Sequence, residues 1–165
     1  MLKQVIIFSD GSSLGNGREN PVAAAAALLC YRGKWKAVGC FLGPATNQQA
    51  EIAAAAVGLE SLNESCRVLL YTDSRYVVET MCGRFKKKTN LDWWNKLEHA
   101  ARIHQITWRW IKGHAGEEPQ EICDHTARTI AENGRVDQKI LDEATSRLVS
   151  LSATAVKKHL VLPHE

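Results

Sequence analysis

Residues 5–17 read V-I-I-F-S-D-G-S-S-L-G-N-G, and this stretch decides how the rest of the chain is interpreted. Its first four residues are branched or aromatic, which is typical of a strand covered on both faces. Glycine and asparagine then indicate a loop. We therefore predict a central strand that ends at Asp10, at the edge of the sheet where open α/β proteins bind their ligands.

A second predicted strand ends in the same way. Residues 68–72 read V-L-L-Y-T and precede Asp73, which is followed by a helix-like segment from Ser74. A lone Asp-Gly pair, as at Asp10, is more often a turn than a site. Two strands that each end in an aspartate instead predict a paired site.

Composition indicates one domain. The chain has 165 residues, of which 45% are hydrophobic, enough for one buried core and too few for two ordinary domains. A net charge of +3 and an isoelectric point near 8.6 permit an anionic partner without requiring one. The densest basic cluster spans residues 84–88, and no periodic acidic partners lie near it in the sequence.

The five cysteines include no CxxC pair, and their odd number argues against a complete disulfide framework. The first residues lead directly into a strand without a signal-peptide pattern, and no apolar run is long enough to span a bilayer. We expect a cytoplasmic, monomeric protein with no membrane association and no obligate protein partner.

Residues 22–42 are ambiguous, because five alanines favour a helix in their first half by propensity. Gly33 is a hairpin-turn signal, however, and residues 35–42 beyond it are strand-like. We therefore predict two antiparallel strands here.

Thr46 and Gln49 match the capping-box pattern and predict a helix that extends to about Leu62. Glu51 is expected in its first turn, where it could serve only helix-end electrostatics. Further strands are predicted at residues 68–72 and 106–111, and further helices at 74–82, 90–101, 120–133 and 137–156. Together these elements make one mixed sheet flanked by helices, an α/β fold.

The candidate site residues are four carboxylates at strand ends or helix starts and one histidine in a glycine-flanked loop: Asp10, Glu51, Asp73, Asp124 and His114. Their contexts, in chain order, are D-G-S, N-Q-Q-A-E, Y-T-D-S, K-G-H-A-G and C-D-H-T-A-R. This ordered set resembles ribonuclease H type 1, and the resemblance extends from about Val5 to Arg128.

The resemblance implies a ribonuclease H-like fold, a five-stranded mixed sheet whose first three strands are antiparallel and whose fourth and fifth run parallel to the first. It also implies two-metal-ion hydrolysis of the RNA strand of RNA/DNA hybrids, which leaves 5′-phosphate and 3′-hydroxyl ends. The alternatives are a resolvase- or integrase-type nuclease of the same fold and a non-catalytic hybrid-binding module. Such a module would normally have lost one or more of the carboxylates.

By position, the family's four metal-binding carboxylates match Asp10, Glu51, Asp73 and Asp124. Its loop histidine, which assists proton transfer and product release, matches His114, although a solvated loop histidine is the plainer interpretation of that residue. The family's hybrid contacts match Asn16, Asn47 and Gln48, and its DNA-phosphate contact matches Thr46. The three amides are also common turn or cap residues.

The chemistry of these residues agrees with the resemblance. Carboxylate oxygens suit Mg²⁺, with Mn²⁺ as a plausible substitute, and two ions roughly 3.5–4 Å apart can activate a water and stabilise the departing 3′ oxygen. Four clustered carboxylates would repel one another without metal. The unperturbed histidine pKa of about 6.5 would let His114 donate or accept a proton near working pH.

The chain departs from the family in three kinds of place, one of which is residues 18–23, where R-E-N-P-V-A replaces the usual glycine-rich entry to the second strand. Gln120 stands where the family usually has Asn, and His125 stands where an acidic residue is common. Between Tyr76 and Trp94 there is no room for the long basic protrusion of many bacterial members. Neither Gln120 nor His125 removes a predicted metal ligand.

Residues 84–88 are all that remains of that protrusion. We expect Lys86, Lys87 and Lys88 to bind backbone phosphates of the hybrid, and an ordinary solvated surface is the competing interpretation. Beyond Gly134 the resemblance fades. We therefore predict a catalytic domain in residues 1–135 and a helical extension, packed on the same domain, in residues 136–165.

Overall fold

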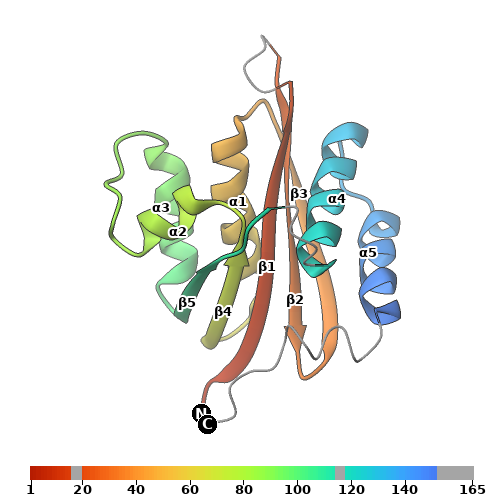
Figure 1. Cartoon of the computed structure of the whole chain (residues 1–165), viewed down its shortest axis with the longest axis horizontal. Coiled ribbons are helices and arrows are strands. Elements are labelled where there is room, and N and C mark those ends of the chain that lie inside the picture. Colours follow the sequence, from red (N-terminus) through yellow and green to blue (C-terminus); the bar gives the residue numbers. More distant parts are fainter. Residues whose placement is uncertain (16–19, 114–117, 152–165) are drawn as a thin grey trace.

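Strand β1 (Lys3–Leu14) lies at the centre of a five-stranded sheet in the computed structural model, which describes residues 1–15, 20–113 and 118–151. The strand order is β3-β2-β1-β4-β5 (Figure 1). Strands β2 (Val22–Tyr31) and β3 (Lys34–Gly43) are antiparallel to their neighbours, whereas β4 (Cys66–Thr72) and β5 (Gln105–Trp110) extend the sheet in parallel. The predicted mixed sheet is confirmed.

The alanine-rich segment is a strand. Residues 23–27 are fully buried, because β2 lies between β1 and β3 and is covered by a helix on each face. Tertiary packing of small side chains therefore outweighs the helix propensity of alanine here. The turn to β3 contains Arg32 and Gly33, both at positive φ (49° and 79°), as in the tight turns that suit the twist of a hairpin.

Helices cover both faces of the sheet (Figure 1). Helices α1 (Asn47–Glu60), α2 (Arg75–Met81) and α3 (Leu91–Ala101) lie on one face, and α4 (Glu118–Asn133) and α5 (Gln138–Ser150) lie on the other. Alternate residues of β1 point to opposite faces: Ile7 packs with the α1 side, and Ile6 and Phe8 pack with the α4 side. The central strand is therefore buried on both faces, as its sequence predicts.

Several predicted boundaries were wrong, three of them next to predicted site residues. Strand β1 does not end at Asp10: it continues to Leu14, because β2 still pairs with it after β4 has ended opposite Ser9. Glu51 lies just beyond the first turn of α1, and α4 begins at Glu118, two residues before the predicted start. The capping box of Thr46 and Gln49 at the start of α1 is confirmed.

Residues 82–90 connect α2 directly to α3, so the described chain has no additional helix at the place of the bacterial protrusion. On the other face, α5 buries Ile140, Ala144 and Leu148 against α4 and β3. The helix predicted to extend to residue 156 ends at Ser150, because Leu151 is its C-cap with a non-helical ψ of 115°; residues 152–165 lie outside the described part. Within the described residues, no helix has both the length and the apolar character needed to cross a membrane.

Candidate active site

Three carboxylates from separate elements meet at one place. Asp10 lies on β1, Glu51 on α1, and Asp73 directly follows β4. Each contributes an oxygen to a group in which all three atoms lie within 4.8 Å of one another. Asp10 and Glu51 are only 2% and 7% exposed. The meeting point is the end of β4, where β1 continues alone with β2.

Gly11 permits this approach. A Cβ atom at Gly11 would lie 2.3 Å from the carbonyl carbon of Ala50 and 2.5 Å from the main-chain nitrogen of Glu51, closer than real side chains come. The main chain of Gly11 also forms a hydrogen bond with the Glu51 carboxylate. The D-G pair in the sequence therefore brings the Asp10 strand against the Glu51 helix.

The backbone around Asp73 is held by the last residue of β5 and the residue that follows it. The indole Nε1 of Trp110 donates a hydrogen bond to the main-chain oxygen of Asp73 at 3.0 Å, and the Ile111 N–H donates to the oxygen of Thr72 at 2.9 Å. The Ser74 side chain caps α2 by accepting from the Val77 N–H at 3.2 Å. Asp73 is thus fixed between the end of β4 and the start of α2.

Burial and mutual repulsion make this group costly to ionise fully. Burial, followed by the charges of Glu51 and Asp73, raises the pKa of Asp10 to about 11. Burial and the charge of Asp73 raise the pKa of Glu51 to about 8. Asp10 Oδ2 and Glu51 Oε2 are buried and have no hydrogen-bond partner. Hard oxygen donors without partners and with unfavourable mutual charge fit a divalent cation.

Asp124 is not part of this compact group. It lies on α4, its side chain is 29% exposed, and its carboxylate pairs with Arg128 one turn later. Its charge nevertheless contributes to the raised pKa of both Asp10 and Glu51, which requires it to lie nearby. Three of the four predicted carboxylates are therefore assembled, and the fourth stands at their side with a cationic partner.

Two predicted site residues, Asn16 and His114, lie outside the described residues. The residue before His114 is described: Gly113 lies against the Asp73 carboxylate, since a Cβ atom there would be 3.2 Å from Asp73 Oδ2. The main chain of Gly113, the residue that precedes His114, therefore lies at the carboxylate group.

The predicted contact residues Thr46, Asn47 and Gln48 are exposed at the start of α1, about one turn before Glu51. The Thr46 hydroxyl accepts from the Gln49 N–H at 3.1 Å, so it also has a structural role as the helix cap. These side chains share the end of the molecule that carries the carboxylate group.

Sequence reasoning missed a side-chain network beside these residues. Gln49 Nε2 donates to Asn90 Oδ1 at 3.1 Å, and Asn90 Nδ2 donates to the hydroxyl of Tyr76 at 3.3 Å. Asn90 was expected only as a helix cap, but its side chain makes no cap bond and its φ is 58°. This network ties the first turns of α1, α2 and α3 together. An asparagine before a helix carries no sequence signal for such a long-range contact.

Two residues attach α4 to the strand that carries Asp10. The Nε2 atom of Gln120, which replaces the usual Asn, donates to the oxygen of Ser9 at 3.0 Å in a buried position. The Cys123 thiol lies 3.4 Å from the oxygen of Phe8 and 3.3 Å from that of Ala26. The other departure, His125, is exposed and points away from the core. The longer side chain of Gln120 therefore links α4 directly to β1.

The basic loop has acidic partners, contrary to the expectation from sequence. Arg84 pairs with Glu79 of α2, and Lys87 pairs with Glu98 of α3. These partners come from neighbouring helices, so the local sequence did not reveal them. Lys86 and Lys88 are exposed and form no ion pair within 4.0 Å with any described residue. Within the basic loop of residues 84–88, these two lysines are therefore the residues best able to bind an anion.

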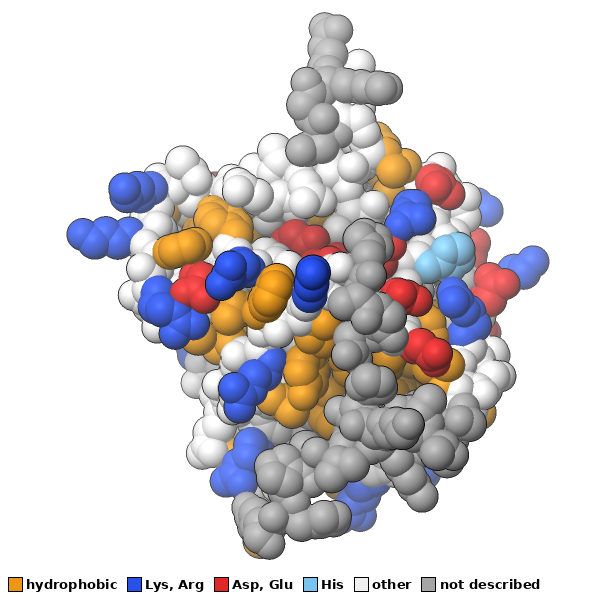
Figure 2. Space-filling model, viewed as in Figure 1, with side chains coloured by type: hydrophobic (Ala, Val, Ile, Leu, Met, Phe, Trp, Pro, Cys, Tyr) orange, Lys and Arg blue, Asp and Glu red, His pale blue; other side chains and the backbone are white. Residues whose placement is uncertain are grey.

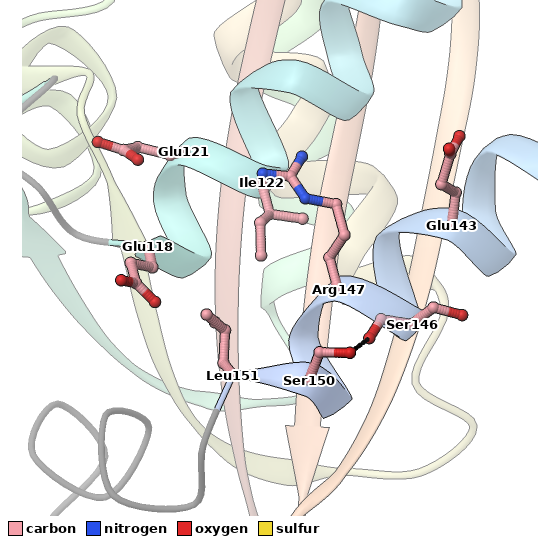
Figure 3. Close-up of a pocket in the computed structure, with 8 residues that line it drawn as sticks. All are labelled: Glu118, Glu121, Ile122, Glu143, Ser146, Arg147, Ser150 and Leu151. Carbon is pink, nitrogen blue, oxygen red and sulfur yellow. Dashed lines mark hydrogen bonds between the residues drawn. The ribbon is translucent and has the colours of Figure 1, made fainter.

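Figure 2 shows acidic side chains near the middle of one face, with Lys and Arg side chains around them. A separate surface hollow of about 530 Å³ lies between α4 and α5 (Figure 3). Its lining includes Glu118, Glu121 and Arg147 but none of the three grouped carboxylates. The candidate site is therefore the carboxylate group at the sheet edge and not this hollow.

Known proteins are similar to this chain over most of its length. A sequence model of the RNase H family matches residues 2–132. Ribonuclease H of Escherichia coli O139:H28 is 42% identical over 146 residues, which cover 81% of this chain and 92% of that protein, and ribonuclease H of Escherichia fergusonii gives the same values. The crystal structure of LC9-RNase H1, described as a type 1 RNase H with the type 2 active-site motif, has a TM-score of 0.73 and 27% identity, and the match covers 90% of this chain and 85% of that one.

Proposed function

The chain belongs to the ribonuclease H family, as a bacterial type 1 member, and we propose from this premise that it hydrolyses the RNA strand of RNA/DNA hybrids and leaves 5′-phosphate and 3′-hydroxyl ends. The observation that carries the proposal is the group formed by Asp10, Glu51 and Asp73. One oxygen from each lies within 4.8 Å of the other two. Buried acidic groups of this kind are unfavourable in a merely structural role.

The carboxylate group would hold Mg²⁺, with Mn²⁺ as a substitute. Asp10, Glu51 and Asp73 supply the central oxygens, and Asp124 joins them if it exchanges Arg128 for the cation. Bound metal of this kind lowers the pKa of a water and neutralises charge on the leaving oxygen of a phosphodiester. The protein's own contribution is to hold these oxygens at fixed positions on β1, α1 and the end of β4.

His114 is proposed to move a proton at the scissile phosphate, in support of which the preceding Gly113 lies against Asp73. Asn16, Asn47 and Gln48 are proposed to contact the hybrid, where amides can read the 2′-hydroxyl, and Thr46 to hold a DNA phosphate. Lys86, Lys87 and Lys88 are proposed to add backbone affinity, chiefly through Lys86 and Lys88, since Lys87 is paired with Glu98.

We also propose that residues 1–135 contain the catalytic unit and that residues 136–165 are accessory. Helix α5 supports this division, because it packs on α4 and β3 and contributes no carboxylate to the three-residue group. A monomer in the cytoplasm remains our proposal for the state of the enzyme.

A cleavage assay tests the function. One labelled RNA is presented in a hybrid, in double-stranded RNA and as a single strand, with and without Mg²⁺. We expect cleavage of the hybrid alone, and only with the metal. A labelled branched DNA is tested in parallel, and its cleavage would favour the resolvase-type alternative. Hybrid binding without any cleavage would favour a non-catalytic module.

A further inference from the structure

Trp110, the last residue of β5, is an exposed aromatic residue at the rim of the carboxylate group. Its side chain is 44% exposed, and its only polar hydrogen is donated to the main-chain oxygen of Asp73 at 3.0 Å. This bond fixes the ring beside a proposed metal-binding residue. The indole therefore cannot turn away without losing a contact to the site.

Arg75 lies on this ring. Its guanidinium carbon is 5.0 Å from the centre of the Trp110 ring, which is the geometry of a cation–π contact. Arg75 is exposed and forms no ion pair within 4.0 Å with a described residue. The acidic residue one turn later on the same helix, Glu79, forms its ion pair with Arg84 and interacts with Arg75 only through its charge. A guanidinium stacked on a ring keeps its N–H edge for an anion.

We infer that Arg75 binds a phosphate of the nucleic-acid backbone beside the carboxylate group and that Trp110 is a positioning residue that holds the guanidinium there. The inference rests on the proposed function, because the hybrid supplies the phosphate. A fixed cation at the rim of this acidic group favours the approach of a polyanion. The neighbours that define the position are Asp73, through the Trp110 hydrogen bond, and Ser74, which caps the helix that carries Arg75.

The test is hybrid binding by the full chain over a range of salt concentrations, in EDTA and in an Asp10→Asn background that prevents cleavage. Arg75→Gln should weaken binding about 5- to 10-fold and reduce the slope of log affinity against log salt by about 1. Arg75→Lys keeps the charge but loses the planar stack. Its affinity and salt slope should therefore lie between those of the wild-type chain and those of Arg75→Gln. Arg102→Gln is the matched control, because Arg102 is exposed and precedes β5, at the opposite end of that strand from Trp110.

A double-mutant cycle tests the role of Trp110. Trp110→Leu should weaken binding when Arg75 is present and have no further effect in Arg75→Gln, since the ring acts through the guanidinium. Trp110→Phe keeps a ring and loses the hydrogen bond to Asp73, so it serves if the leucine variant does not fold. In the cleavage-competent chain, Arg75→Gln should raise KM and leave kcat nearly unchanged.

An unchanged affinity and salt slope in Arg75→Gln would overturn this inference while leaving the proposed function intact, and so would equal effects of Arg75→Gln and Arg102→Gln. Additive effects of Arg75→Gln and Trp110→Leu on hybrid binding would show that Trp110 does not act by positioning Arg75. A wild-type chain that neither binds nor cleaves a hybrid would overturn the proposed function, and this inference with it.

Discussion

Asp10 and Asp124 are proposed ligands of the same site, yet their surroundings are opposite. Asp10 is buried on the central strand beside two other carboxylates, and one of its oxygens has no partner. Asp124 stands on a helix at the side, partly exposed and paired with Arg128. The first carboxylate is held in place by the core of the fold, and the second is held by its own helix and a surface cation.

This contrast indicates a division of work within the site. A carboxylate buried without a cation destabilises the protein, so its position is useful only when a cation is present. A carboxylate that already has a cationic partner can exchange that partner at small cost, because an exposed ion pair one turn apart on a helix is worth only about 0.3–0.5 kcal/mol. The rigid group would define where metal binds, and Asp124 would adjust to it.

The largest expected effect separates the two aspartates. Asp10→Asn should lower hybrid cleavage by about 10³-fold or more, since it removes a charged ligand from the centre of the site. In EDTA the same change should raise the melting temperature, because folding near neutral pH no longer has to protonate a carboxyl group that is ionised in the unfolded chain. Cleavage rates and thermal unfolding in EDTA measure the two effects.

Asp124→Asn is the matched variant for this comparison. It should also reduce cleavage, but in EDTA it should leave the melting temperature unchanged or slightly lower, because the pair with Arg128 is lost. Equal stabilisation by Asp10→Asn and Asp124→Asn would contradict the difference in burial and charge pairing between the two aspartates.

Removal of residues 136–165 tests whether the segment packed beside α4, the helix that carries Asp124, is accessory. Loss of the buried Ile140 and Leu148 should lower the free energy of unfolding by about 3–6 kcal/mol, while cleavage persists below the new melting temperature. Denaturant unfolding and the hybrid assay measure both. Leu148→Ala in the full chain, expected to cost about 2–5 kcal/mol, is the control for lost packing alone. A folded truncated chain without cleavage would contradict the proposed accessory role.

Gly11→Ala tests the buried side directly. The added Cβ would overlap the backbone of Ala50 and Glu51, so α1 must move away from β1. We expect a loss of about 1–3 kcal/mol of stability together with reduced cleavage at temperatures where the protein is folded. Gly58→Ala, on the same helix but with contacts of 3.0 Å or more to side chains, should retain cleavage. Normal activity in Gly11→Ala would show that cleavage does not require the close approach of β1 and α1 at this position.

The smallest expected effect concerns neither aspartate. Changing Lys86 and Lys88 to alanine should raise KM and leave kcat nearly unchanged. It should also reduce the slope of log hybrid affinity against log salt by about 1 per lost contact. Lys87→Ala should change the slope less, because Lys87 is paired with Glu98. An unaltered slope in the double variant would assign these lysines to ordinary surface.

The same contrast explains what could be predicted from the sequence. Asp10, Glu51 and Asp73 follow or interrupt strong local patterns, so their elements and their meeting at the sheet edge were predictable, although β1 extends beyond Asp10 through its pairing with β2. The pairing of Asp124 with Arg128, the partners of Arg84 and Lys87, and the Gln49–Asn90–Tyr76 network were not predicted. Most of these depend on side chains that meet only after the helices have packed.

The raised pKa values of Asp10 and Glu51 also fix the direction of a pH effect. Between the unfolded pKa values near 4 and the folded values of about 11 and 8, the native protein binds more protons than the unfolded chain. The stability of the metal-free protein should therefore fall as the pH rises from about 5 to 9. A cation that requires the ionised carboxylates must displace these protons.

Proton release on addition of Mg²⁺ at pH 7 tests this account most directly. Calorimetric titration in two buffers of different ionisation enthalpy gives the number of protons released per chain. We expect the wild-type chain and Asp124→Asn to release at least about one proton, and Asp10→Asn to release fewer. Binding of Mg²⁺ without proton release, or equal release by the wild-type chain and Asp10→Asn, would contradict the claim that the buried carboxylates form the metal site.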